Sequence, residues 1–262
     1  MKADNNGYNS DIRQYIFVIR ELTAREIKRK YARSSLGIIW SVLNPLLNMV
    51  VMSLIFSTMF RRSIENFPIY YLTGQIFWTL FSGATNSAMT ALVDNRNLLI
   101  KAKLPKQTFV LSRIYTTLVN FGYTCIAYVL MLVIFRIKPT FAMLLFPLAV
   151  VFMLMISIGV SYILSVVYVF FADVKYLYSV FLTLWMYMSA LFYPISGLPE
   201  SMQKFIGFNP IYLVIAFARE CVMYGKVPDV MMWVKLVCWS LGIMWLGLAV
   251  FKRGENQVMQ RV

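Results

Sequence analysis

The sequence predicts an all-α membrane protein with six transmembrane helices, an N-terminal amphipathic interfacial helix and re-entrant helices between spans five and six. Three observations predict this fold class. Hydrophobic residues make up 60% of the 262 residues and charged residues only 14%, which is outside the range of ordinary soluble domains. Several apolar runs are long enough, as helices, to cross roughly 30 Å of hydrocarbon. The charged residues gather between these runs.

An N-terminal tail and an amphipathic helix are predicted over residues 1–37. Between Asp11 and Arg33, apolar residues recur at helical spacing and basic residues fill much of the remainder. A helix with one apolar and one basic face lies in the membrane surface rather than crossing it. Its basic residues are typical of segments that stay on the cytoplasmic side.

The first predicted span runs from Ile38 to Phe60. Within it Ser41, Asn44 and Asn48 recur at steps of three and four, so they share one helical face. Buried amides in lipid are costly unless they meet partners or water, which predicts that this face looks onto protein or a cavity. Pro45 removes one backbone hydrogen bond and predicts a bend.

Five further apolar runs complete a six-span membrane domain over residues 38–251. They cover about 68–93, 110–135, 141–172, 176–193 and 231–251. The segment of about 94–108, between spans two and three, is polar and basic around several leucines and predicts a short amphipathic helix. The basic residues of the N-terminal segment, of 94–108 and of the tail 252–262 outnumber those on the other side. Both termini are therefore predicted to be cytoplasmic.

The fifth span presents an aromatic face. Tyr178, Phe181, Trp185 and Phe192 recur at helical steps, and Tyr193 lies beside them. Tyr and Trp rings are usual at membrane interfaces, but Trp185 lies nearer the middle of the span. Such rings suit the C–H faces and hydroxyls of sugars. Packing between helices is the alternative interpretation.

The region of about 194–229 is divided into short pieces by seven Pro and Gly residues. Its apolar run, Ile211 to Ala218, is too short to span a membrane, and Arg219 and Glu220 follow at once. This pattern predicts a pair of short re-entrant helices that dip into the outer leaflet.

The sequence argues against catalysis and against an energy source within this chain. It contains no histidine, and none of its eleven carboxylates lies in the middle of a long apolar run. A proton-coupled transporter, a hydrolase or a transferase would therefore lack its usual groups. The motif G-x-x-x-x-G-K-[ST] of ATP-binding loops is absent, and the three cysteines form no metal-binding pattern. We expect no catalytic residue, metal or cofactor here, and no nucleic-acid partner despite the net charge of +14.

Residues 30–46 carry a resemblance to a known family. The pattern basic-Tyr-x-Arg-Ser-x-Leu-Gly-x-x-Trp-x-x-x-Asn-Pro-Leu resembles the start of the first membrane helix in ABC-type polysaccharide export permeases. That family exports lipid-linked O-antigen, capsule and teichoic acid chains. The resemblance implies a homodimeric permease in the bacterial cytoplasmic (inner) membrane. Two copies of a separate ATP-binding subunit, which bind MgATP, are expected to drive transport of the lipid-linked glycan.

The resemblance also implies roles for individual residues. The glycan would pass between two copies of the chain, lined by spans one and five. The expected path residues are Trp40, Asn44, Asn48, Phe77, Trp78, Tyr178, Phe181, Trp185, Phe192 and Tyr193. In the family, the segment between spans two and three docks on the ATPase. The coupling residues expected there are Asn97, Leu98, Lys101, Leu104 and Pro105. The basic residues expected to recruit substrate phosphates are Arg29, Lys30 and Arg33.

Three alternatives stay open at this stage. A drug or lipid exporter of the same architecture would be stimulated by small hydrophobic compounds. An integral-membrane enzyme of lipid-linked sugar assembly would turn over as the isolated chain, although the usual acid and base groups are absent. A passive channel would conduct without nucleotide.

Overall fold

The computed structural model describes residues 5–32, 34–56, 64, 66–101 and 104–261. Every regular element in this part of the chain is a helix, which confirms the all-α fold class. The helices in chain order are α1 (Asn5–Tyr31), η1 (Gly37–Ile39), α2 (Trp40–Phe56), α3 (Phe67–Met89), α4 (Ala91–Asp94), α5 (Arg96–Lys101), α6 (Gln107–Ile134), η2 (Phe141–Leu145), α7 (Phe146–Phe170), α8 (Val174–Tyr187), η3 (Ile195–Gly197), α9 (Glu200–Ile206), α10 (Pro210–Val222) and α11 (Val230–Arg261).

Four helices among the described residues are long and apolar enough to cross a membrane. They are Gly37–Phe56, Gln107–Ile134, Phe141–Phe170 and Val230–Glu255. These helices correspond to the predicted spans one, three, four and six. The last part of the predicted first span, residues 57–60, lies outside the described residues.

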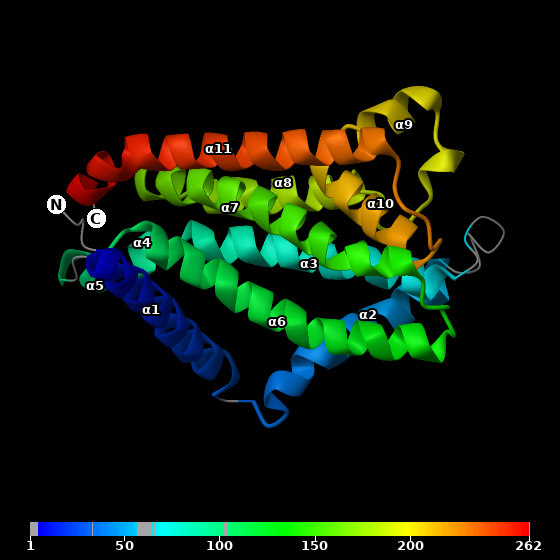
Figure 1. Ribbon diagram of the computed structural model, residues 1–262, viewed down its shortest axis with the longest axis horizontal. Helices are drawn as coiled ribbons and strands as arrows, with labels where there is room; N and C mark the ends of the chain where they lie inside the picture. Colours follow the sequence, from blue (N-terminus) through cyan, green and yellow to red (C-terminus); the bar gives the residue numbers. More distant parts are fainter. Residues whose placement is uncertain (1–4, 33, 57–63, 65, 102–103, 262) are drawn as a thin grey trace.

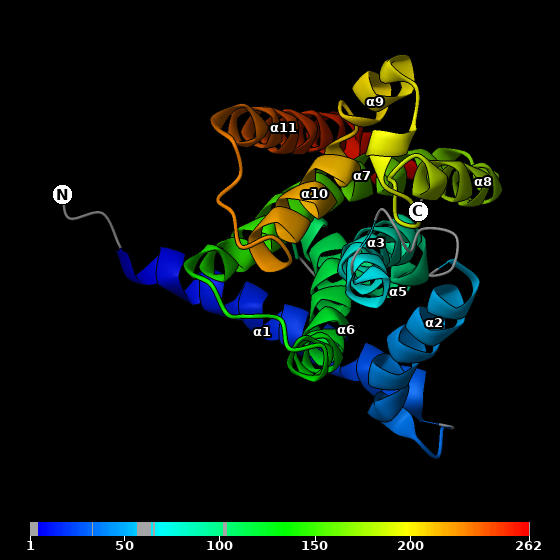
Figure 2. The same cartoon turned by 90° about the vertical axis from the view of Figure 1, so that its right-hand side faces the viewer.

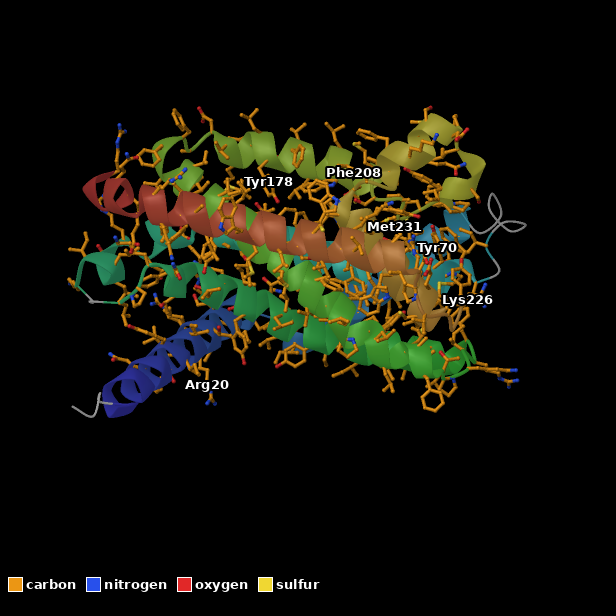
Figure 3. The ribbon with its side chains drawn as sticks, turned by 45° about the horizontal axis from the view of Figure 1, so that its top comes forward. Arg20, Tyr70, Tyr178, Phe208, Lys226 and Met231 are labelled. Carbon is orange, nitrogen blue, oxygen red and sulfur yellow. The ribbon has the colours of Figure 1, made fainter. Side chains whose placement is uncertain are left out.

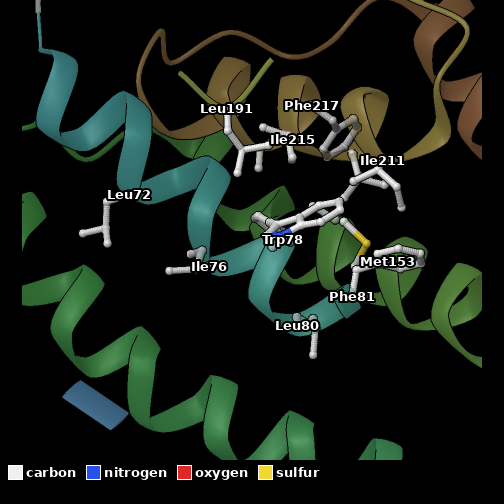
Figure 4. Packing of buried hydrophobic residues seen from close by; sticks show 14 of the residues in the cluster. Leu72, Ile76, Trp78, Leu80, Phe81, Met153, Leu191, Ile211, Ile215 and Phe217 are labelled. Carbon is white, nitrogen blue, oxygen red and sulfur yellow. The ribbon is translucent and has the colours of Figure 1, made fainter. Parts of the chain in front are cut away.

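Helix α3, the predicted second span, is the central helix of the bundle. It contacts α2, α6, α7 and α10, and most of its residues are buried. Because protein surrounds it, α3 accommodates the buried hydroxyls of Thr73 and Thr85, which donate to backbone carbonyls one turn earlier. Figure 4 shows Trp78 of α3 in one packed cluster with Met153 of α7 and Ile211 of α10.

The predicted fifth span differs from the structure. It was expected as one helix over 176–193, whereas α8 ends at Tyr187 after 14 residues and the chain then turns. Ala190 has a positive φ of 47°, which a helix cannot accommodate. The carbonyls of Ala190 and Leu191 accept hydrogen bonds from the side chain of Arg219 instead of from helix amides. Helix α8 is thus shorter than the ~20 residues that a full span needs.

The region after α8 contains the expected pair of short helices. Helices α9 and α10 form a pair bent by 92°, a geometry typical of a broken span or a re-entrant loop. Asn209 begins α10 as a capping residue, because its side chain accepts a hydrogen bond from the amide of Ile211 at 3.0 Å. The last helix, α11, continues to Arg261, so the predicted tail over 252–262 extends this helix over most of its length.

Helices α7 and α11 approach each other closely through glycines. A Cβ on Gly159 would lie 2.3 Å from the carbonyl oxygen of Ile243, and a Cβ on Gly247 would lie 2.2 Å from the carbonyl oxygen of Gly159. Ser157 and Ser161 of α7 are also fully buried, and small residues of this kind let helices pack closely.

The start of α1, the end of α11 and the short helices α4 and α5 gather at one end of the molecule (Figure 1). Helix α9 lies at the opposite end. Figure 2 shows α1 and α2 on one side of the bundle that α3, α6, α7, α10 and α11 form. Figure 3 places Arg20 of α1 and Lys226, which follows α10, toward opposite ends. The segments that the sequence predicts on one side of the membrane thus gather at one end of the bundle.

Candidate functional site

Two neighbouring cavities open beside the N-terminal helix. The first, of about 320 Å³, lies between α2, α3 and α6 at the end of α1. The second, of about 400 Å³, lies between α1, α3 and α6. Both are lined by Lys30, Thr79 and Asn120, and we call them together the polar groove. Its other lining residues are Glu26, Arg29, Tyr31, Trp40, Ser41, Asn44, Pro45, Asn48, Gln75, Gly83, Ser87, Arg113, Thr116, Thr117 and Thr124.

The polar face of α2 forms one wall of the groove, as its spacing predicts. Asn44 and Asn48 line the first cavity, where Trp40 is 39% exposed. Pro45 lies inside α2 and has no N–H, so the carbonyl of Ser41 lacks its helical donor. The hydroxyl of Thr124 donates to that carbonyl at 3.2 Å. The proline therefore helps to join α2 to α6.

A stripe of polar residues on α6 forms the facing wall. The side chains of Thr116, Thr117, Asn120 and Thr124 donate to carbonyls four residues earlier in the same helix. Their oxygens stay available as acceptors. The Asn120 Oδ1 accepts a hydrogen bond from the Tyr31 hydroxyl at 3.1 Å. These groups suit a ligand that is rich in hydroxyls.

Basic residues lie at the α1 side of the groove. Arg29 and Lys30 are exposed and line the second cavity. Arg33, the third residue expected to recruit phosphates, lies outside the described residues. The groove therefore combines neutral hydrogen-bonding groups from α2 and α6 with positive charge from α1.

An ion-pair network, which sequence analysis did not predict, includes Glu26 and Arg113 from the wall of the second cavity. Arg113 Nη1 donates to Glu26 Oε2 at 2.6 Å, and Arg113 Nη2 donates to Asp94 Oδ2 at 3.0 Å. Glu26 belongs to α1 and Asp94 ends α4. The sequence places a single arginine near the inner end of span three. It does not indicate that Glu26, more than 80 residues away, and Asp94 bind this arginine.

The aromatic path candidates divide into buried and partly exposed residues. Phe77 and Trp78 of α3, Tyr178 of α8 and Phe192 are buried in the core. Tyr178 donates to the Thr85 hydroxyl oxygen at 2.7 Å, which joins α8 to α3. These four side chains pack between helices in this conformation, and their role in a path stays a prediction.

The other aromatic candidates are more accessible. Phe181 is 49% exposed. Trp185 is half-buried, packs edge-on against Phe81 and Phe181, and donates through Nε1 to Asn209 Oδ1 at 2.9 Å. The Tyr193 hydroxyl donates to the Tyr187 carbonyl at 2.6 Å. Within one chain, Asn44 and Asn48 of α2 line a cavity with residues of α3 and α6 and do not face these rings.

The candidate coupling residues lie at the end of the molecule where the two termini gather. Asn97, Leu98 and Lys101 are exposed on α5, whereas Leu104 and Pro105 are half-buried. Leu99 of the same helix is buried, so α5 rests on the bundle by one face and presents the other to the surroundings. This arrangement agrees with the short amphipathic helix that the sequence predicts.

Arg219 of α10 is a further residue whose role sequence analysis missed. It is only 3% exposed and lies 3.4 Å from the centre of the Tyr70 ring. Its guanidinium donates to the carbonyls of Tyr70, Ala190 and Leu191 at 3.0–3.2 Å. The sequence showed only a charge after a short apolar run. The structure shows that this side chain joins α10, α3 and the turn after α8.

The family of the chain follows from a match over most of its length. Residues 18–223 match the ABC-2 type transporter family. The all-helical bundle, the polar groove and the surface helix α5 fit a membrane-embedded transporter. The chain therefore belongs to the ABC-2 type transporter family, as the resemblance predicts.

Curated relatives are similar over nearly their whole length. The O-antigen export system permease protein RfbA of Myxococcus xanthus is 28% identical over 254 residues, which cover 96% of this chain and 98% of the relative. The polysialic acid transport protein KpsM of Escherichia coli is 24% identical and covers 92% of this chain and 95% of its own length. The capsule polysaccharide export inner-membrane protein CtrC of Neisseria meningitidis is 26% identical over 92% of each chain.

Proposed function

We propose that this chain is the membrane-spanning permease subunit of an ATP-driven exporter of lipid-linked polysaccharide. The observation that carries the proposal is the similarity, across almost the full length of both chains, to an O-antigen export permease. Two further relatives transport a polysialic acid and a capsule polysaccharide. The polysaccharide of this chain would be of the O-antigen, capsule or teichoic acid type.

The proposed assembly has two copies of this chain and two copies of an ATP-binding subunit. The sequence has no ATP-binding loop of its own, so MgATP would bind in the partner. Helix α5 presents Asn97, Leu98 and Lys101 on the surface, at the end of the molecule where α1 begins and α11 ends. This position supports a docking role for the segment. Leu104 and Pro105 would complete the contact.

The proposed topology has six membrane crossings in the bacterial cytoplasmic membrane, with both termini in the cytoplasm. Helix α3 would be the second crossing, since its 23 residues are long enough to span the membrane. It need not be as apolar as the other spans, because neighbouring helices surround it. Helix α8 with the turn after it would be the fifth, and α9 with α10 a re-entrant pair. Helix α1 would lie at the cytoplasmic surface, where its exposed Ile16 and Phe17 can enter the lipid interface.

We assign substrate contact first to the polar groove. Hydroxyls and amides on α2 and α6 can hydrogen-bond sugar hydroxyls, and Arg29 and Lys30 can attract phosphate. In a homodimer, the exposed faces of α2 and α8 would border the path between the copies. Trp185 of α8 and Tyr193, which follows this helix, would then contact the substrate from the α8 side of the path.

Export by the native bacterium tests the proposed function. Deletion of the chain is expected to remove the surface polysaccharide and to leave its lipid-linked form inside the cell, and the intact chain should restore it. The ATP-binding subunit is expected to copurify with this chain, and its inactivation should give the same phenotype. Normal surface polysaccharide after deletion would refute the proposal.

Substitutions in the groove and on α8 test the path. Asn44→Leu and Asn48→Leu are expected to reduce export because they remove amides that line the groove. Ile126→Ala is the control, because Ile126 lies on α6 outside the lining of both cavities and is 62% exposed. Trp185→Ala should reduce export while the complex still assembles. Wild-type export by all three site variants would remove these residues from the path.

A further inference from the structure

Arg113 contacts the groove and the coupling region with one guanidinium. Its Nη1 binds Glu26 of α1, and its Nη2 binds Asp94 at the end of α4. Glu26 and Arg113 both line the second cavity of the polar groove. Asp94 lies two residues before α5 and also accepts a hydrogen bond from the Thr90 hydroxyl at 2.7 Å. One side chain therefore joins a wall of the groove to the start of the exposed helix α5.

The arrangement depends on the shape of the arginine side chain. A guanidinium is planar and presents N–H groups in fixed directions, so it can hold two carboxylates on different helices at once. A lysine ammonium carries the same charge but has no such fixed geometry. The side chain of Arg113 is 12% exposed, against 22% for Glu26 and 46% for Asp94. Solvent therefore screens the Glu26 contact less than it would screen a fully exposed pair.

The segment that carries α5 has a second attachment at its other end. Lys106 Nζ lies 3.3 Å from Glu255 Oε1 and 3.1 Å from the Glu255 carbonyl oxygen, on α11. The segment between Asp94 and Lys106 is thus held by ionic contacts on both sides. Of the two, the Asp94 contact leads to residues that line the groove, so a displacement of α5 can reach the groove through Arg113.

We propose that Arg113 is a positioning residue that transmits movement of α5 to the polar groove, so that the groove changes with the nucleotide state of the partner. The inference rests on the proposed function, because it requires an ATP-binding subunit docked on α5. When α5 moves, Asp94 pulls the Arg113 guanidinium with it. The guanidinium in turn pulls Glu26 and the adjoining turn of α1. Lys30 and Arg29, on that same helix, then shift relative to α3 and α6.

The test measures groove accessibility in the complete complex of this chain with its copurifying ATP-binding subunit. A single reporter cysteine replaces Thr79, which is exposed and lines both cavities. Cys125, Cys221 and Cys238 are replaced by serine. The rate of reaction with a membrane-impermeant maleimide is measured without nucleotide and after trapping with MgATP and vanadate. With Arg113 intact, trapping is expected to change the rate by about fivefold or more.

The variants separate transmission from simple attachment. Arg113→Lys, Glu26→Gln and Asp94→Asn should each reduce the nucleotide response to less than about twofold. The double variant Glu26→Gln with Asp94→Asn should lose no more than either single variant, because a relay fails when either contact is broken. Lys106→Gln is the matched control: it removes a charge from the same segment but leaves Arg113 in place, and it should keep the response.

The outcomes distinguish this inference from the proposed function. If no ATP-binding subunit copurifies, both fail. If the subunit copurifies and hydrolyses ATP, the proposed assembly stands, and an unchanged response in the three Arg113-network variants overturns the inference. Two further results overturn it: no response with Arg113 intact, and an equal loss in Lys106→Gln, since general loosening of the segment would then explain the effect.

Discussion

Two arginines in this protein, Arg219 and Arg113, join three chain segments each, but they do so through different partners. Arg219 is buried, lies over the Tyr70 ring and donates to backbone carbonyls of α3 and of the turn after α8. Arg113 is less deeply buried and binds the carboxylates of two side chains, Glu26 and Asp94, on α1 and α4.

The difference in partners implies a difference in role. Backbone carbonyls are fixed by the course of the chain, so Arg219 determines how α10 and the turn after α8 pack on α3. Carboxylates lie on side chains of helices that can shift, so the Arg113 contacts can carry a movement from one helix to another. The end of the molecule with α10 is thus held by contacts to fixed backbone, and the end with α5 by side-chain contacts that can follow a movement. Four substitutions test this comparison, in order of their expected effect on stability.

Replacement of Arg219 by leucine is expected to have the largest effect. It leaves the buried carbonyl of Leu191 without its Arg219 donor and that of Ala190 with only the Tyr70 hydroxyl at 3.5 Å, and each unsatisfied buried group costs about 1–3 kcal/mol. The loss in free energy of unfolding should be about 3 kcal/mol or more, and the thermal midpoint in detergent should fall on the order of 10 °C. An unchanged midpoint would show that Arg219 does not hold these segments.

Replacement of Gly74 by alanine should destabilise the same region less. A Cβ at this position would lie 2.8 Å from Arg219 Nη2, which cannot move freely because it donates to Tyr70 and Leu191. We expect a loss of about 1–3 kcal/mol. Gly122→Ala on α6 is the control, since among the described residues no atom outside its own stretch of helix lies within 4 Å of the added Cβ. Equal midpoints for the two alanine variants would contradict the close fit around Arg219.

Replacement of Arg113 by glutamine should affect stability less and transport more. The partners of Arg113 are partly exposed, so loss of these contacts is expected to cost about 1 kcal/mol or less. Export should nevertheless fall about tenfold, a change typical of a lost coupling between sites. Parallel measurement of the thermal midpoint and of surface polysaccharide checks both parts. A large drop in the midpoint would make Arg113 a structural residue like Arg219.

Replacement of Lys204 by glutamine should have the smallest effect. Lys204 pairs with Glu200 at 2.8 Å on α9, but both side chains are at least 77% exposed. Such surface pairs contribute about 0.5 kcal/mol or less. The thermal midpoint should stay within about 2 °C of the unsubstituted protein. A drop as large as that of Arg219→Leu would show that exposure does not determine how much these side-chain contacts contribute to stability.

Much of the fold was predictable from apolar length and periodicity. Four predicted spans correspond to long apolar helices, the short helix α5 lies inside the predicted segment 94–108, and α9 and α10 form a bent pair where the re-entrant helices are predicted. The steps between Ser41, Asn44 and Asn48 correctly placed the polar face of α2 on a cavity. These features depend on contacts within one helix or on transfer from water to lipid, both of which a local pattern records.

The fifth span shows where local patterns fail. Its aromatic spacing continues through Phe192, yet α8 ends at Tyr187 because Arg219 binds carbonyls of the following turn from 28 residues and more away. The aromatic positions also did not reveal which rings are buried, since Phe192 is 5% exposed and Phe181 49%. The outcome depends on which neighbouring helix covers each ring.

By itself the sequence determined the all-helical membrane fold, the position of the short surface helix α5 and the lack of an ATP-binding loop. The tertiary structure decided which polar groups meet: Tyr31 with Asn120, Arg113 with Glu26 and Asp94, and Arg219 with three backbone carbonyls. The physical reason is that hydrophobic periodicity reports the average surroundings of one helix. Hydrogen bonds and ion pairs between helices depend on the relative position of segments far apart in the chain.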